Sequence, residues 1–107
     1  DKVLQRLADI LKENIRQTDI VGRWGGEEFI VAFIDTKLDS ANKLSEKLRD
    51  QIEKDDVLLQ LARQTVTASF GITSLKTDDT MDSLLKRADD ALYEAKDHGK
   101  NQIISYD

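Results

Sequence analysis

The chain has 107 residues, of which 35% are charged and 39% hydrophobic, and a formal net charge of −5. This length suits one domain around a single core, and the composition excludes a disordered chain. The acidic balance argues against a sequence-independent nucleic-acid binder, whose surface would be basic. Cysteine is absent, which excludes disulfides and thiolate sites and fits a reducing, cytoplasmic location. No apolar run approaches the roughly 18 residues of a membrane-spanning helix.

The first predicted element is an amphipathic helix from Asp1 to about Arg16. Its apolar residues recur at helical spacing, namely Val3, Leu4, Leu7, Ile10, Leu11 and Ile15. The connector Arg16-Gln17-Thr18-Asp19 follows. Its arginine and aspartate either pair with each other at the surface or form an anion site for a phosphate or a guanine edge. The residues alone favour the simple pair.

Two glycines meet two acids at the tip of a predicted hairpin. Residues 19–24 and 29–34 read as strands, and Gly25-Gly26 as a tight turn that accepts positive φ and leaves room for a ligand. Both faces of 29–34 are apolar, so we expect a central strand covered on both sides. Glu27 and Glu28 open this strand on opposite faces, where carboxylates beside bare backbone could hold a divalent metal and a phosphate. Spacing alone favours the alternative, a hairpin with two solvated glutamates.

The remaining segments alternate helix and strand. We expect a helix over about 38–54, a short strand over 57–61, a strand over 65–75, a helix from a cap at Thr80 or Asp82 to about Asp97, and a strand over 102–106. Gly71 inside its strand predicts a bulge or a close backbone approach. The order indicates an α/β (α+β) sandwich with a mixed sheet. One more strand and helix in front would complete a ferredoxin-like or palm arrangement.

Two lysines straddle the end of the last predicted helix. Lys96 lies in its final turn, and Lys100 follows Gly99, the residue expected to end the helix. Lysines in this position often only neutralise the helix end. The alternative is that both hold triphosphate oxygens.

Four motifs in order resemble the GGDEF family of diguanylate cyclases. Gly25-Gly26-Glu27-Glu28-Phe29 matches the family signature in its GGEEF form, and Arg16-x-x-Asp19 matches its RxxD product-inhibition motif. Residues Thr67–Ile72 match the family motif T-x-S-x-G. Residues Ala88–Lys96, followed by Gly99-Lys100-Asn101, match the family ending ADxALYxAKxxGRN. The similarity spans the whole chain, and this order of motifs outweighs the plain hairpin.

The resemblance implies an enzyme that condenses two GTP into cyclic di-GMP with release of pyrophosphate, using Mg²⁺ or Mn²⁺. Glu27 would ligate the metal and help to activate the 3′-hydroxyl, and Glu28 would shape the site and assist. The implied nucleotide-binding residues are Asp1 at the guanine edge, Gly25 and Gly26 beside the nucleotide, and Lys96 and Lys100 at the triphosphate. Arg16 and Asp19 would bind product at an inhibitory site.

The resemblance also implies a family segment that would precede Asp1: a first strand and helix with the FKxIND and GHxxGD motifs. We therefore expect residues 1–107 to be one N-terminally truncated GGDEF domain, with unpaired strand edges and little activity alone. Catalysis would require an antiparallel homodimer, and an upstream sensor or receiver domain is expected of the parent protein. The expected cytoplasmic location is compatible with a membrane anchor elsewhere in that protein. The alternatives are a receptor that binds cyclic di-GMP through Arg16 and Asp19 without catalysis, and a structural dimerisation unit.

Overall fold

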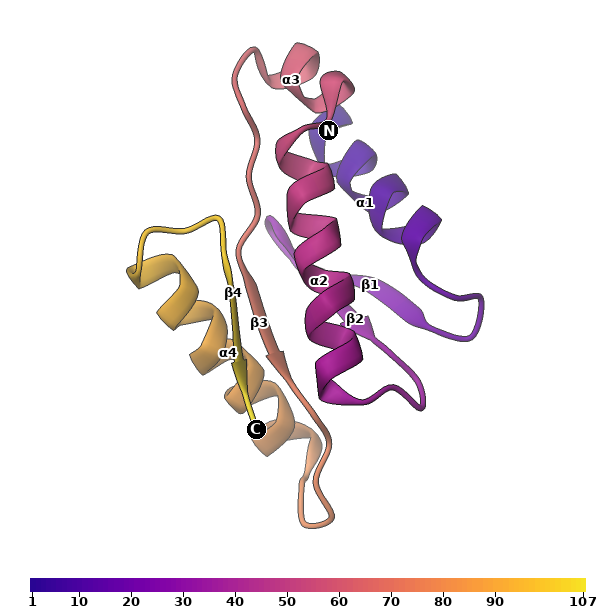
Figure 1. Ribbon diagram of the computed structural model, residues 1–107, viewed down its shortest axis with the longest axis vertical. Coiled ribbons are helices and arrows are strands. Elements are labelled where there is room, and N and C mark those ends of the chain that lie inside the picture. The colour runs from indigo at the N-terminus through magenta and orange to yellow at the C-terminus, as the bar shows by residue number, and fades with distance from the viewer.

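The computed structural model describes residues 1–107 as four helices and two small sheets (Figure 1). In chain order the elements are α1 (Lys2–Asn14), β1 (Ile20–Gly25), β2 (Glu28–Ala32), α2 (Leu38–Glu53), α3 (Asp56–Ala62), β3 (Phe70–Thr73), α4 (Met81–Asp97) and β4 (Ile103–Tyr106). The strands β3 and β4 lie between α2 and α4 (Figure 1). The predicted mixture of helices packed on strands is confirmed. No helix combines the length and apolar composition needed to cross a membrane.

The strands form two pairs rather than one mixed sheet. β1 and β2 pair antiparallel from Ile20↔Ala32 to Gly25↔Glu28, and β3 and β4 pair parallel from Phe70↔Ile103 to Thr73↔Tyr106. The expectation of a central strand over 29–34 is wrong, because β2 pairs with β1 alone and its five residues are only half-buried. One edge of β2 and one edge of β3 are unpaired, as expected for this chain, so no strand pairing joins the two sheets.

The core gathers around the first three helices. Its fully enclosed members come from α1, α2 and α3: Ile10, Leu11, Leu48, Ile52 and Leu58. The inner face of the hairpin packs on this cluster through Val21, Phe29 and Val31, and Phe70 of β3 reaches it as well. One apolar cluster therefore fixes the hairpin relative to α1 and relative to the second sheet.

The segment predicted as a strand over 57–61 is the helix α3. Asp55 decides this, because its side chain caps the helix by accepting from Leu58 N at 2.8 Å. Arg6 of α1 also donates to the Asp55 carboxylate at 3.1 and 2.7 Å, and this contact lowers the pKa of Asp55. A short apolar run has no distinct period, so the sequence alone did not separate a short helix from a strand over 57–61.

The next strand is shorter than predicted, since only Phe70–Thr73 of the segment 65–75 pairs. Within it, Gly71 meets the backbone of α4. A Cβ on Gly71 would lie 2.8 Å from Leu92 Cα and closer still to Ala88 O and Leu92 N. The predicted close approach is confirmed, and the register shows no bulge.

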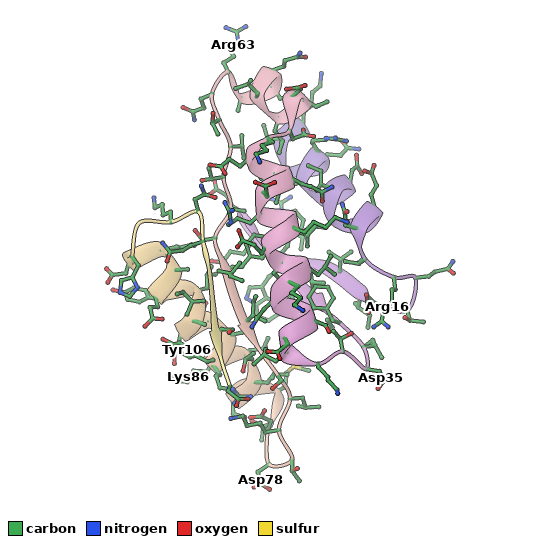
Figure 2. The ribbon with its side chains drawn as sticks, in the orientation of Figure 1. Arg16, Asp35, Arg63, Asp78, Lys86 and Tyr106 are labelled. Atoms are coloured by element: carbon green, nitrogen blue, oxygen red, sulfur yellow. The ribbon has the colours of Figure 1, made fainter.

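The start of α4 is held by a cap and an ion pair. Thr80 Oγ1 accepts from Ser83 N at 3.1 Å, and Ser83 Oγ accepts from Thr80 N at 2.9 Å. Arg87 reaches back with bonds of 2.9 and 2.6 Å to Asp79, next to Asp78 at the tip of the β3–α4 loop (Figure 2). The hydrogen bond from Arg87 holds the pKa of Asp79 far below its usual range.

Asp79 gives the fold an acid-sensitive contact. Because the pKa of Asp79 is lowered in the folded chain, the unfolded chain binds a proton at this carboxylate more readily. The contribution of the ion pair to the free energy of unfolding is therefore present above about pH 4 and is lost as the pH falls further. We expect Asp79→Asn to lower the free energy of unfolding at about pH 7 and to weaken its decline towards about pH 3. Urea unfolding at both pH values measures this. An unchanged pH dependence in the variant would contradict the assignment.

Candidate functional site

A pocket of about 300 Å³ lies between α1 and the β1–β2 hairpin. Its lining combines polar and apolar side chains with bare backbone: Asp1, Leu4, Gln5, Ala8 and Lys12 from the helix, and Val21, Gly22, Arg23 and Phe29 from the hairpin. Asp1 caps the helix, with Oδ1 accepting from Val3 N at 2.7 Å and Leu4 N at 3.2 Å. Both bonds end on Oδ1, which leaves Oδ2 free to accept from a ligand.

The glycine turn is open on its outer side. Gly26 has a φ of 48°, and a Cβ at Gly25 or Gly26 would meet no heavy atom within 4 Å. Arg23 fixes the turn by donating to Gly26 O from Nε at 3.0 Å and from Nη2 at 2.6 Å. On the sequence alone, Arg23 was given no role. Its position three residues before Gly26, whose carbonyl oxygen it binds, is the only sequence feature that pointed to this contact. The turn therefore offers a fixed backbone surface on which a large group can lie.

The two acids of the turn have different surroundings. Glu27 is exposed and has no ion pair or side-chain hydrogen bond, whereas Glu28 is half-buried at the start of β2. Lys96 of α4 approaches Glu28, with Nζ 3.7 Å from Oε2. This contact places the tip of the β1–β2 hairpin next to the C-terminal end of α4. The spacing of the residues in the sequence did not predict this proximity. Both side chains of the pair are nearly half-exposed, so the pair adds little stability, and Lys96 can exchange a carboxylate for a phosphate.

The hairpin acids do not form a self-contained metal site. No group of three or more histidine, cysteine, aspartate or glutamate side chains is arranged so that it could hold a metal ion. Mg²⁺, however, usually binds through one or two carboxylates together with substrate phosphates. Glu27 and Glu28 are oxygen donors of this kind, so they fit a divalent ion that arrives with a nucleotide.

Lys100 lies in an unusual loop after α4. Gly99, Lys100 and Asn101 have φ values of 111°, 64° and 48°. The Lys100 amide donates to Ala95 O at 3.0 Å, but its exposed side chain has no protein partner. Its ammonium group is therefore available to an anion.

Arg16 and Asp19 pair with each other, as the residues alone favoured, but only the arginine is at the surface: the side chains are 56% and 2% exposed. Arg16 Nη2 lies 3.1 Å from Asp19 Oδ1, and Ile34 N donates to the same oxygen at 3.0 Å. Arg16 also donates to Ile34 O and, at 2.8 Å, to Thr36 Oγ1. The hydrogen bond from Arg16 lowers the pKa of Asp19. Arg16 projects from the α1–β1 loop (Figure 2), and neither residue lines the pocket.

The β1–β2 hairpin lines the pocket and carries Glu27 and Glu28 at its glycine turn, although neither acid lines the pocket itself. Carboxylates on the same hairpin as a pocket suit a ligand that binds together with a divalent cation. The family profile "Diguanylate cyclase, GGDEF domain" matches residues 1–102. The chain belongs to the GGDEF family of diguanylate cyclases, which confirms the resemblance.

The relatives include enzymes named for this activity. The diguanylate cyclase DgcM of Escherichia coli K12 is 41% identical over 105 residues, covering 98% of this chain and 25% of that protein. The chain thus spans about a quarter of the length of the curated relatives it matches.

Solved structures confirm the fold. The active GGEEF domain of a diguanylate cyclase from Vibrio cholerae has a TM-score of 0.89 at 31% identity, over 100% of this chain and 68% of that one. The GGDEF domain of DgcB from Caulobacter crescentus, solved in complex with c-di-GMP, has a TM-score of 0.88 over 97% of this chain and 63% of that one. At 23% identity this second likeness concerns the fold alone.

Proposed function

We propose that the protein carrying this chain condenses two GTP into cyclic di-GMP with release of pyrophosphate. The observation that carries the proposal is the pocket beside an open glycine turn, with Glu27 exposed at the tip and Lys96 directed at the same hairpin. This arrangement offers acids for proton and metal chemistry next to a cation for phosphate. Family membership supports the same reaction.

The nucleotide would lie along the pocket and the turn. Asp1, with its free Oδ2, would accept from the guanine N–H groups at the α1 end. Gly25 and Gly26 would let the nucleotide lie against the backbone. Lys96, released from Glu28, and Lys100 would bind the triphosphate as point charges.

Each bond-forming step joins a 3′-hydroxyl oxygen to an α-phosphorus and breaks the bond to pyrophosphate, which departs with its electron pair. Such a reaction needs positioning and charge neutralisation more than covalent help from the protein. Glu27 would hold a divalent cation together with triphosphate oxygens and help to remove the hydroxyl proton, while Glu28 shapes the site. Bound Mg²⁺ or Mn²⁺ would supply neutralisation of the phosphate charge. One chain carries one such site, so two GTP would meet in an antiparallel homodimer.

Residues 1–107 alone would have little or no activity. The hairpin acids belong to no group of three side chains that could hold a metal ion, and β2 and β3 have unpaired edges, so packing and the half-exposed Lys96–Glu28 pair alone join the two halves of the site. The test is incubation of GTP and Mg²⁺ with the whole protein and, in parallel, with the 107-residue chain. Cyclic di-GMP from the first and none from the second is expected; equal rates would contradict this proposal.

Arg16 and Asp19 would bind cyclic di-GMP as an inhibitory site. Asp19 is held almost fully buried by backbone and guanidinium contacts, while 56% of the Arg16 side chain is exposed, so the donor face is already oriented for an anion. The pair lies outside the pocket, so product and substrate would not compete directly. This separation also favours the second candidate function, a receptor that binds cyclic di-GMP without making it.

Arg16→Ala is expected to weaken cyclic di-GMP binding roughly tenfold or more, the worth of one charge-assisted hydrogen bond. Titration calorimetry of cyclic di-GMP against the variant measures the loss. Lys43→Ala removes an exposed cation from α2 and serves as the control, with binding as in the parent. Equal affinities for the Arg16 variant and the control would reject the inhibitory site.

A further inference from the structure

The loop that carries Lys100 needs support from outside itself. Three successive residues, Gly99, Lys100 and Asn101, have positive φ, and two of them are not glycine. A lysine is poorly suited to this region because its Cβ crowds the backbone. Such a conformation persists only where the surrounding structure holds it.

The support comes from α2 through Asn101. Arg49 Nη1 donates to Asn101 Oδ1 at 2.9 Å, and Asn101 Nδ2 donates to Glu53 Oε2 at 2.8 Å. The Asn101 backbone amide donates to Ser69 Oγ at 3.1 Å. These three bonds bind both ends of the side chain and the backbone of one residue, so they set the orientation of the loop.

The guanidinium of Arg49 is itself fixed. It donates to Glu46 Oε1 from Nε at 2.9 Å and from Nη2 at 2.5 Å, and Nη1 lies 3.3 Å from Glu53 Oε1. Only 16% of the Arg49 side chain is exposed. The cluster is therefore a rigid bracket on α2 rather than a loose surface pair.

We propose that Arg49, Glu53 and Asn101 are positioning residues that hold Lys100 in place to bind the GTP triphosphate. The inference rests on the proposed function. The Lys100 side chain has no protein partner, so the backbone of its loop directs it. Without the bracket, the loop keeps the bond from the Lys100 amide to Ala95 O but loses its hold on α2, and the ammonium group is then less well placed. The bracket residues need not touch the nucleotide, so their loss should raise KM for GTP far more than it lowers kcat.

The test measures binding of a non-hydrolysable GTP analogue by calorimetry, and KM and kcat for GTP, on the whole protein. Asn101→Ala is expected to weaken analogue binding roughly tenfold, close to the loss in Lys100→Ala. In the double variant, Asn101→Ala should add nothing to Lys100→Ala, because it acts through that lysine. Glu53→Ala removes the acceptor of the Asn101 side-chain amide and should bind like Asn101→Ala.

The control is Asn42→Ala, which removes a 3.2 Å hydrogen bond from α2 to Ser105 without reaching the loop. Thermal unfolding checks that each variant is folded at the assay temperature. Additive losses in the double variant, or parental binding by Asn101→Ala, would overturn the inference. If Lys100→Ala binds normally while the parent makes cyclic di-GMP, the inference fails and the proposed function stands. If the unmodified protein neither binds the analogue nor makes cyclic di-GMP, both the inference and the proposed function are rejected.

Discussion

Glu27→Gln is expected to reduce cyclic di-GMP formation by roughly a thousandfold, within the range lost when a catalytic proton acceptor is removed. Glutamine keeps the size of the side chain but has no negative charge to hold a divalent cation and no base to accept the hydroxyl proton. Glu27 is exposed and makes no ion pair or side-chain hydrogen bond, so the change should leave folding intact. A lower rate of cyclic di-GMP formation would therefore reflect the loss of a catalytic group and not a loss of folded protein.

The measurement is the initial rate of cyclic di-GMP formation by the whole protein, followed by chromatography. Glu13→Gln makes the same chemical change on an exposed part of α1 and should leave the rate as in the parent. Cyclic di-GMP binding by the Glu27 variant should also persist, since Arg16 and Asp19 lie outside the pocket. If Glu27→Gln forms cyclic di-GMP at the parental rate, Glu27 is not a catalytic residue.

Gly71→Ala is expected to destabilise the fold by about 3 kcal/mol or more, at the upper end of the cost of overpacking. The new methyl group would press on the backbone of α4 at Ala88 and Leu92. Backbone in the middle of a helix cannot move aside as a flexible side chain can. Relief would require α4 to move away from β3, which also shifts Lys96 relative to the hairpin.

Urea unfolding of the protein and its variant measures this difference. Gly22→Ala is the matched control, because a Cβ on Gly22 meets nothing within 4 Å, and its effect should stay within about 0.5 kcal/mol. A Gly71→Ala variant as stable as the Gly22→Ala control would mean that α4 does not pack on β3 as closely as described.

Local patterns predicted much of this structure because their causes are local. Helical spacing predicted α1, α2 and α4, and Thr80, one of the two caps proposed for α4, is the observed cap. Turn chemistry predicted a glycine turn between two strands, but the observed turn lies one residue later: Gly25 ends β1 opposite Glu28, and Gly26 and Glu27 form the turn. Of these residues only Gly26 has positive φ, and Glu28 alone opens β2. The helix α3 was mistaken for a strand because a run of five residues, four of them apolar, is too short to show a period. Its cap, Asp55, also contacts Arg6, which is far away in sequence.

The pairing of strands and the assembly of the site depend on contacts that spacing does not encode. Apolar faces on residues 29–34 wrongly predicted a central strand, since alternation describes burial and not the number of neighbouring strands. The motifs identified Glu28, Lys96 and Asn101 as members of one family pattern. Only the folded chain brings Lys96 to Glu28 and fastens Asn101 to Arg49 and Glu53.

The most direct test of the central claim is to incubate the whole protein with GTP and Mg²⁺ and to quantify cyclic di-GMP and pyrophosphate together. Condensation of two GTP predicts that both products appear, with two pyrophosphates released for each cyclic di-GMP. Binding of cyclic di-GMP with no pyrophosphate release would contradict the cyclase account and identify a receptor that uses Arg16 and Asp19.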